Sequence, residues 1–180
     1  TQKFSVKASK DPAVFGPQDC VIVAVKAQSL GEVAARIAPL VGKNTSILTA
    51  MNGVPWWFFD RLKFGNGRER LESLDPGGKL SRAMPTDRIV GCVIHLAASI
   101  PQRGLISHNM GRRLIVGEPG GKNTERTRRI AQALTSALSE KHDSDSLARL
   151  SAIIDQNAQG YERTRAGKRM VELELSFRAN

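Results

Sequence analysis

Two apolar runs, each followed by a polar residue, constrain the fold of this chain more than any other feature. Residues 19–26 read Asp-Cys-Val-Ile-Val-Ala-Val-Lys, and residues 46–53 read Ser-Ile-Leu-Thr-Ala-Met-Asn-Gly. Near-continuous apolar runs are typical of strands in parallel sheets, because helices cover both faces of such sheets. Ligands of open α/β sheets bind beyond the carboxyl ends of the strands. We therefore expect Lys26 and Asn52 to line one crevice.

The segment between the two runs has the pattern of a crossover helix. Apolar residues recur at helical spacing from Val33 to Val41. Ser29 and Glu32 fit a capping box at the start of this helix, and Pro39 should end or kink its last turn. A strand, a helix and a second strand in this order predict a right-handed βαβ unit.

The chain after Asn52 predicts further elements. Residues 89–98 read as a third buried strand, and its last two residues are small enough to let a flat ligand approach the backbone. Gly104–His108 and Arg113–Gly117 have the pattern of a β-hairpin with its turn between them. Thr124–Ser139 has apolar residues at four-residue spacing, which predicts a helix with Asn123 as its cap.

The segment between the second and third strands is irregular. Val-Pro-Trp-Trp-Phe-Phe follows Gly53, and Pro55 is well placed to open a short helix there. The aromatic residues could pack that helix against the sheet edge or cap the crevice. Lys63–Asp87 is rich in glycine, proline and charged residues, so we expect an extended surface excursion.

Composition excludes several classes of protein. At 180 residues and 41% apolar residues the chain can bury a core, and it contains no apolar run of the roughly 20 residues that span a membrane. Cys20 and Cys92 both lie in predicted strands, as unpaired buried thiols do, which fits a reducing, cytoplasmic setting. The three histidines show no metal-ligand spacing, so no metal site is expected.

The formal net charge is +10, which raises the question of a nucleic-acid partner. Residues 1–111 hold 14 Lys and Arg against 8 Asp and Glu, and residues 112–180 hold 13 against 9. The excess is therefore spread along the chain, whereas a nucleic-acid footprint needs clustering. We expect no nucleic-acid partner, and diffuse positive charge can instead attract a cofactor that carries phosphate.

Common phosphate-binding motifs are absent from the sequence. Gly117–Thr124 resembles a phosphate loop, but Val116 and Asn123 stand where the motif requires glycine and serine or threonine. The dinucleotide fingerprint Gly-x-Gly-x-x-Gly is also missing. These residues alone predict a binding crevice in an α/β fold, but they do not identify its ligand.

Four segments together resemble the ketopantoate reductase family, also called the 2-dehydropantoate 2-reductases. They are Gly-Pro-Gln-Asp-Cys-Val-Ile-Val-Ala-Val-Lys-Ala (16–27), Met-Asn-Gly-Val-Pro-Trp-Trp-Phe-Phe (51–59), Gly-Cys-Val-Ile-His-Leu-Ala-Ala (91–98) and Gly-Arg-Arg-Leu-Ile-Val-Gly-Glu (111–118). The resemblance covers about three quarters of the chain, from Phe4 to Ser139, in the order and spacing of the family.

The resemblance implies an α/β, Rossmann-like three-layer sandwich with a mostly parallel sheet that binds NADPH. It also implies hydride transfer to the 2-keto acid ketopantoate, giving pantoate for pantothenate biosynthesis. Lys26 and Asn52 would then contact the cofactor, and Asn52 would also reach the substrate. Ala98, or its neighbour Ala97, would contact the cofactor through its backbone. On the residues alone, a solvated strand-end lysine and a turn asparagine stay open as structural roles for Lys26 and Asn52.

The sequence departs from the family at both ends. The glycine loop of the family, with its first βαβ portion, is not found, so residues 1–139 read as a partial NADP-binding domain and residues 140–180 as a divergent tail, partly helical or disordered. Lys168 lacks the residues that flank the proton-donating lysine of the family, so no catalytic residue is assigned. We expect a truncated form that is weakly active or inactive.

Three alternatives stay open at this level. The chain could be a non-catalytic binding or interaction module that retains part of the fold. It could belong to a reductase of another 2-keto acid. The sequence also leaves open whether copies of the chain associate into a homo-oligomer.

Overall fold

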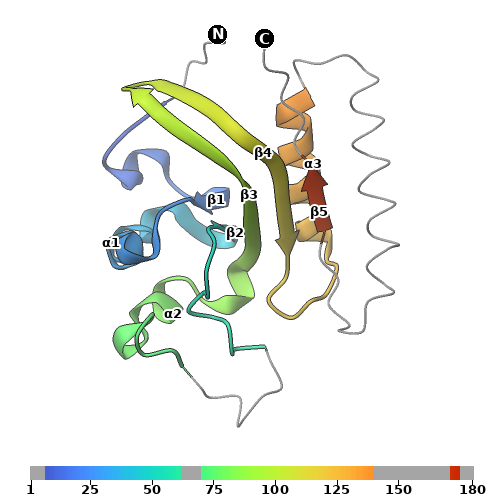
Figure 1. Cartoon of the computed structure of the whole chain (residues 1–180). Helices are drawn as coiled ribbons and strands as arrows, with labels where there is room; N and C mark the ends of the chain where they lie inside the picture. The colour runs from blue at the N-terminus through green and yellow to red at the C-terminus, as the bar shows by residue number, and fades with distance from the viewer. Residues whose placement is uncertain (1–6, 62–69, 140–170, 175–180) are drawn as a thin grey trace.

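A computed structural model of the chain describes residues 7–61, 70–139 and 171–174. These residues form one five-stranded sheet in the order β1-β2-β3-β4-β5, with helices packed on it (Figure 1). The elements in chain order are β1 (Gln18–Val23), α1 (Leu30–Arg36), β2 (Val41–Ala50), α2 (Lys79–Ala83), β3 (Ile89–Gln102), β4 (Leu105–Gly117), α3 (Glu125–Ser139) and β5 (Val171–Glu174). The α/β, Rossmann-like class expected from the sequence is confirmed.

The parallel part of the sheet consists of β1, β2 and β3. Helix α1 connects β1 to β2, so the predicted βαβ unit is present. The predicted capping box is wrong, because Ser29 makes no side-chain cap hydrogen bond and already has helical backbone angles. It ends a 3-10 turn, Ala27–Ser29, that runs directly into α1.

The antiparallel part of the sheet corrects the predicted hairpin. β3 continues to Gln102, and β4 runs without a break from Leu105 to Gly117, so the turn lies at residues 103–104. The predicted turn residues lie inside β4, where the pairing register shifts opposite residues 95–98. Gly111 has φ +76°, and a Cβ atom there would lie 2.2 Å from the carbonyl oxygen of His95. Gly111 therefore belongs to a β-bulge inside β4. In a sequence, the glycine of a bulge cannot be told from the glycine of a turn.

Two apolar clusters hold the helices to opposite faces of the sheet. One contains the buried residues Val23, Leu30, Ile37, Ile47, Trp56, Leu80, Met84 and Ile89, and it lies under α1 and α2. The other contains Leu48, Val90, Cys92, Val116 and Ala131, and it lies under α3. The two buried faces explain why β2 and the start of β3 are almost continuously apolar.

Helix α3 begins as predicted, but its cap differs by one residue. The backbone N–H of Thr127 donates to Oγ1 of Thr124 at 3.3 Å, so Thr124 is the capping residue. Asn123 does not cap the helix, and its Oδ1 is buried without a hydrogen bond among the described residues.

The described parts of the connection between β2 and β3 contain more regular structure than the sequence indicated. Pro55 does not open a helix, because residues 56–61 form turns. Part of the predicted excursion, residues 63–69, lies outside the described residues, but α2 forms within the remainder. The carboxylate of Asp75 is buried and accepts hydrogen bonds from the backbone N–H of Leu80 at 2.7 Å and from Oγ of Ser81 at 2.6 Å. This carboxylate stabilises the start of α2.

Most of the predicted tail, residues 140–170 and 175–180, lies outside the described residues. The four residues between these ranges form β5, which pairs antiparallel with β4. The expected division of the chain at residue 139 stays a prediction. Among the described residues, no helix is long and apolar enough to cross a membrane.

Candidate functional site at the carboxyl edge of the parallel strands

The strand register brings two of the predicted site residues to one edge of the sheet. Val23 of β1 pairs with Thr49 of β2, and Thr49 pairs with Gly91 of β3. Lys26 and Asn52 each lie three residues beyond this row. Both therefore follow the carboxyl ends of adjacent parallel strands, where ligands of α/β sheets bind.

The side chain of Asn52 is held by the backbone of β3. Its Nδ2 donates to the carbonyl oxygen of Ile94 at 2.9 Å, and the N–H of Ile94 donates to its Oδ1 at 2.8 Å. The carboxamide thus continues the pairing of β2 with β3 beyond the last backbone pair, Ala50 with Cys92. One N–H and one lone pair of this exposed amide are left for a ligand.

Lys26 is exposed at the same edge. Its carbonyl oxygen accepts a hydrogen bond from the N–H of Ser29 at 2.9 Å, which starts the turn into α1. Its side chain forms no hydrogen bond or ion pair with another described residue. The ammonium group is therefore available to an anionic or hydroxyl-rich ligand.

Ala98 lies on a different part of the structure from Lys26 and Asn52. It pairs with His108 in the β3–β4 arm, which extends beyond the ends of β1 and β2 (Figure 1). At about 3.3 Å per residue, Ala98 is about 13 Å further along β3 than Ile94. The structure therefore brings Lys26 and Asn52 to one edge and places Ala98 on the arm that rises from it.

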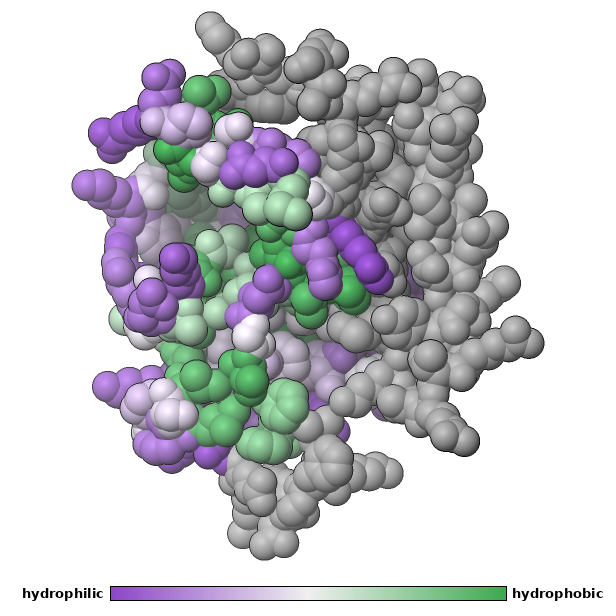
Figure 2. Space-filling view, in the orientation of Figure 1, coloured by the Kyte–Doolittle hydropathy of each residue, from purple (hydrophilic) through white to green (hydrophobic). Residues whose placement is uncertain are grey.

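Apolar side chains reach the surface on the face shown in Figure 2. On the β3–β4 arm, Ile100, Ile106 and Met110 are 70%, 74% and 68% exposed. The arm has no acidic residue between Ile89 and Gly117. Its surface is thus apolar and weakly cationic next to the candidate site.

A cavity among the described residues lies at the opposite end of the parallel strands. It has a volume of about 990 Å³, and its lining includes Cys20, Lys43 and Arg88, near the starts of β1, β2 and β3, and Ile130 of α3. The cavity is therefore separate from the edge that carries Lys26 and Asn52.

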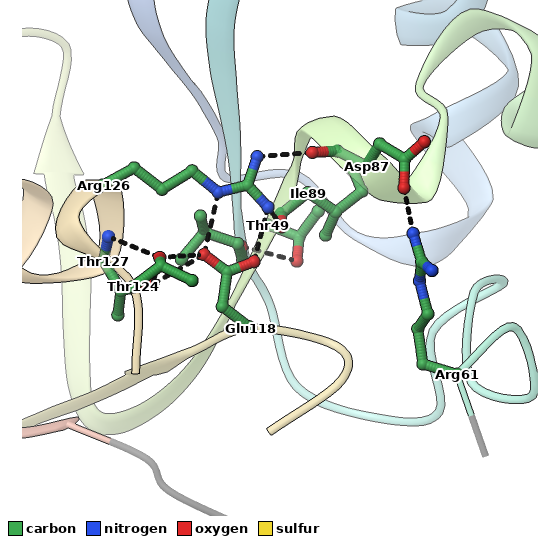
Figure 3. A network of polar contacts seen from close by, with 9 residues as sticks. Thr49, Arg61, Asp87, Ile89, Glu118, Thr124, Arg126 and Thr127 are labelled. Atoms are coloured by element: carbon green, nitrogen blue, oxygen red, sulfur yellow. Dashed lines mark hydrogen bonds and ion pairs between the residues drawn. The ribbon is translucent and has the colours of Figure 1, made fainter. Parts of the chain in front are cut away.

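A polar network beside this cavity joins β4, α3 and the segment before β3 (Figure 3). Glu118, which directly follows β4, accepts hydrogen bonds from Nε of Arg126 at 2.8 Å, from Oγ1 of Thr127 at 2.9 Å and from Oγ1 of Thr124. Nη2 of Arg126 also forms an ion pair with Glu118 and donates to the carbonyl oxygen of Ile89 at 3.1 Å.

Two opposing effects act on the pKa of Glu118. Burial of the carboxylate raises its pKa, but hydrogen bonds from Arg126, Thr124 and Thr127 favour the charged form more strongly. The pKa of Glu118 is therefore held below its ordinary value. The sequence did not reveal this network, because its residues are joined by a glycine-rich loop that has no periodic pattern. The sequence pattern that could have predicted the network is a glutamate directly after an apolar strand, followed by threonine and arginine in the first turn of the next helix.

Comparison with known proteins places the chain in a family. The family model described as Ketopantoate reductase PanE/ApbA matches residues 1–57. A 2-dehydropantoate 2-reductase from Mesorhizobium japonicum is 38% identical over 132 residues, which cover 73% of this chain and 40% of the relative. The chain belongs to the ketopantoate reductase family.

Solved structures agree with this assignment. A protein from Ralstonia solanacearum MolK2, assigned as a ketopantoate reductase, is 50% identical with a TM-score of 0.67, and the match covers 71% of this chain and 39% of that one. The 2-dehydropantoate 2-reductase from Geobacter metallireducens GS-15 is 29% identical with a TM-score of 0.50, covering 69% of this chain and 35% of that one. The chain thus spans about two fifths or less of the length of these relatives.

Proposed function

We propose that this chain contributes part of the NADPH-binding domain of a reductase that converts 2-dehydropantoate to pantoate, a reaction of pantothenate biosynthesis in the cytoplasm. The main support for this proposal is that Lys26 and Asn52 lie together at the carboxyl edge of the parallel strands. The second support is the similarity of the chain to a 2-dehydropantoate 2-reductase. NADPH, when bound, supplies the hydride.

The described residues fit one portion of this cofactor. The free ammonium of Lys26 suits a phosphate or a ribose hydroxyl, and the amide of Asn52 can donate and accept towards the nicotinamide or the keto acid. The backbone of Ala98 on the arm is the third proposed contact. A glycine loop that would cradle the diphosphate is not found in the sequence. We therefore expect this chain alone to bind NADPH weakly and to turn over slowly or not at all.

Fluorescence titration with NADPH tests the proposed site. Removing one charge-assisted contact costs about 1.5–3 kcal/mol, so Lys26→Ala should weaken binding about tenfold or more. Asn52→Ala should weaken it too, since it removes the amide and its two hydrogen bonds to Ile94. Lys79→Ala, at an exposed lysine of α2, is the matched control and should leave the affinity unchanged.

Equal NADPH affinities for Lys26→Ala and Lys79→Ala would contradict the proposed site. Titration with a random oligonucleotide across a salt series covers the alternative of an interaction module. A steep salt dependence for the oligonucleotide, without saturable NADPH binding, would favour that module. Turnover assays with a panel of 2-keto acids test the expectation that the chain alone is weakly active. Turnover of any of these acids at a rate typical of enzymes would refute it.

A further inference from the structure

The chain carries a chemically labile pair of residues just beyond the end of β2. Asn52 is followed by Gly53, and both residues are exposed. The backbone nitrogen that follows an asparagine can attack Cγ of the side chain and expel ammonia, which gives a cyclic imide. Glycine hinders this attack least, because it has no side chain. The N–H of Gly53 has no hydrogen-bond partner among the described residues, so its nitrogen is free to react.

The other described asparagines lack such a neighbour. Asn44, Asn109 and Asn123 are followed by threonine, methionine and threonine, whose side chains shield the backbone nitrogen. A second Asn-Gly pair, at residues 66–67, lies outside the described residues. Asn52 is therefore the described asparagine at which cyclisation meets the least steric hindrance.

Two hydrogen bonds to one residue of β3 oppose the reaction at Asn52. Nδ2 donates to the carbonyl oxygen of Ile94, and Oδ1 accepts from its N–H. Both bonds need a planar carboxamide that faces β3. Attack makes Cγ tetrahedral, so Oδ1 and Nδ2 leave this plane, and Nδ2 then departs. Cyclisation therefore requires the pairing with Ile94 to open first.

We propose that Asn52 is a deamidation site that its pairing with Ile94 keeps intact and that opening of this pairing exposes to reaction. The bond between the nitrogen of Gly53 and Cγ of Asn52 forms, and the bond between Cγ and Nδ2 breaks. Nδ2 leaves as ammonia, together with the proton of the Gly53 N–H. Water then opens the imide at one of its two carbonyl groups, which gives aspartate or isoaspartate.

The product cannot restore the original pairing. Aspartate has no N–H for the carbonyl oxygen of Ile94, and isoaspartate adds a methylene group to the backbone after β2. Either product also places a negative charge at the edge of the sheet where we propose that NADPH binds. This last consequence depends on the proposed function, whereas the modification and its rate do not.

The rate of deamidation tests the proposal on the whole 180-residue chain, without NADPH. The chain is kept in mildly alkaline buffer, either folded or in urea, and peptide mapping by mass spectrometry follows the change from amide to acid. Asn44 and Asn52 lie on one tryptic peptide, residues 44–61, so Asn44 is an internal reference that should change little. Asn52 should deamidate about tenfold or more slowly in the folded chain, because two hydrogen bonds must open there first.

Two glycine variants of the β3–β4 arm distinguish this pairing from a general effect of folding. In Gly111→Ala a Cβ atom would lie 2.2 Å from the carbonyl oxygen of His95, the neighbour of Ile94, so deamidation of Asn52 should be faster in this folded variant. Gly104→Ala also places alanine at a positive φ, but its Cβ would meet no atom within 4 Å, so the rate should not change. Unchanged amide exchange in β2 verifies that each variant folds. The wild-type comparison in buffer and urea does not depend on either variant.

Any of three results would overturn the proposal. Asn52 could deamidate equally fast in the folded chain and in urea, or fail to deamidate in urea. The third such result is an equal rate in folded Gly111→Ala and Gly104→Ala. Failure of the chain to bind NADPH would change none of these rates, so the two proposals can fail separately.

Discussion

Replacing Glu118 by glutamine should destabilise the fold much more than replacing Glu125, the exposed acidic residue of α3. The side chain of Glu118 is 8% exposed and accepts from Arg126, Thr124 and Thr127, whereas Arg126 is 33% exposed. Glutamine keeps one carbonyl oxygen but turns an N–H group towards the guanidinium. One or two charge-assisted hydrogen bonds are lost, each worth about 1.5–3 kcal/mol. Because Arg126 is partly exposed, solvent screening reduces the energy of these hydrogen bonds. We therefore expect a loss of about 2–3 kcal/mol in the free energy of unfolding.

Urea unfolding of the full chain measures this loss. With a slope of about 1–3 kcal/mol per molar urea, the midpoint should fall by about 1 M or more. Glu125→Gln is the matched control, because Glu125 and Arg128 form an ion pair with 71% and 56% exposed side chains. Exposed pairs contribute about 0–1 kcal/mol, so this midpoint should hardly move. A double-mutant cycle with Arg126→Met should show strong coupling between Glu118 and Arg126.

The pH dependence provides a second check on the same reasoning. The pKa of Glu118 is lowered in the folded chain, so the unfolded state binds more protons at this group. Its stabilising contribution is therefore complete above the ordinary glutamate pKa of about 4.3 and is lost as pH falls through the lower folded value. The difference between wild type and Glu118→Gln should be constant near neutral pH and shrink below about pH 4. Equal midpoints for Glu118→Gln and Glu125→Gln would refute the argument.

Two further predictions concern single positions. Gly111→Ala should destabilise the β3–β4 arm much more than Gly104→Ala. Both glycines have positive φ, but a Cβ atom at position 111 would lie 2.2 Å from the carbonyl oxygen of His95, whereas one at position 104 would meet no atom within 4 Å. Amide hydrogen exchange along the arm measures the difference. Burial raises the pKa of the Cys92 thiol to about 11 and also raises that of Cys20. Both thiols should thus react slowly with a thiol reagent at pH 8, Cys92 more slowly than Cys20, and comparable rates for Cys92 and a free thiol would contradict this.

The sequence predicted those parts of the fold that depend on apolar periodicity. The runs that became β2 and the first half of β3 are apolar because both faces of the sheet are covered there. The equally apolar run of β1 also forms a strand, and Lys26 and Asn52 follow the carboxyl ends of β1 and β2. The hairpin was misplaced because Gly111 serves a bulge, and bulges and turns use glycine for the same backbone freedom.

The site was predictable only in part, for a related reason. A strand end shows where a polar residue lies along the chain but not which neighbour its side chain contacts. The hydrogen bonds of Asn52 to Ile94 join residues 42 positions apart, and those of Arg126 to Asp87 and Ile89 join residues 39 and 37 positions apart. Such contacts depend on tertiary packing, which local patterns do not encode. The ligand contacts of Lys26, Asn52 and Ala98 stay predictions.

The pairing of Asn52 with Ile94 couples the arm to the edge of the sheet mechanically. Both hydrogen bonds of the carboxamide end on one residue of β3, directly below the point where the arm leaves the sheet. Any rotation of β3 at Ile94 would turn the amide plane of Asn52 with it or break both hydrogen bonds. A molecule that touches the outer arm would therefore reorient a donor and an acceptor at its base, without any direct contact between them.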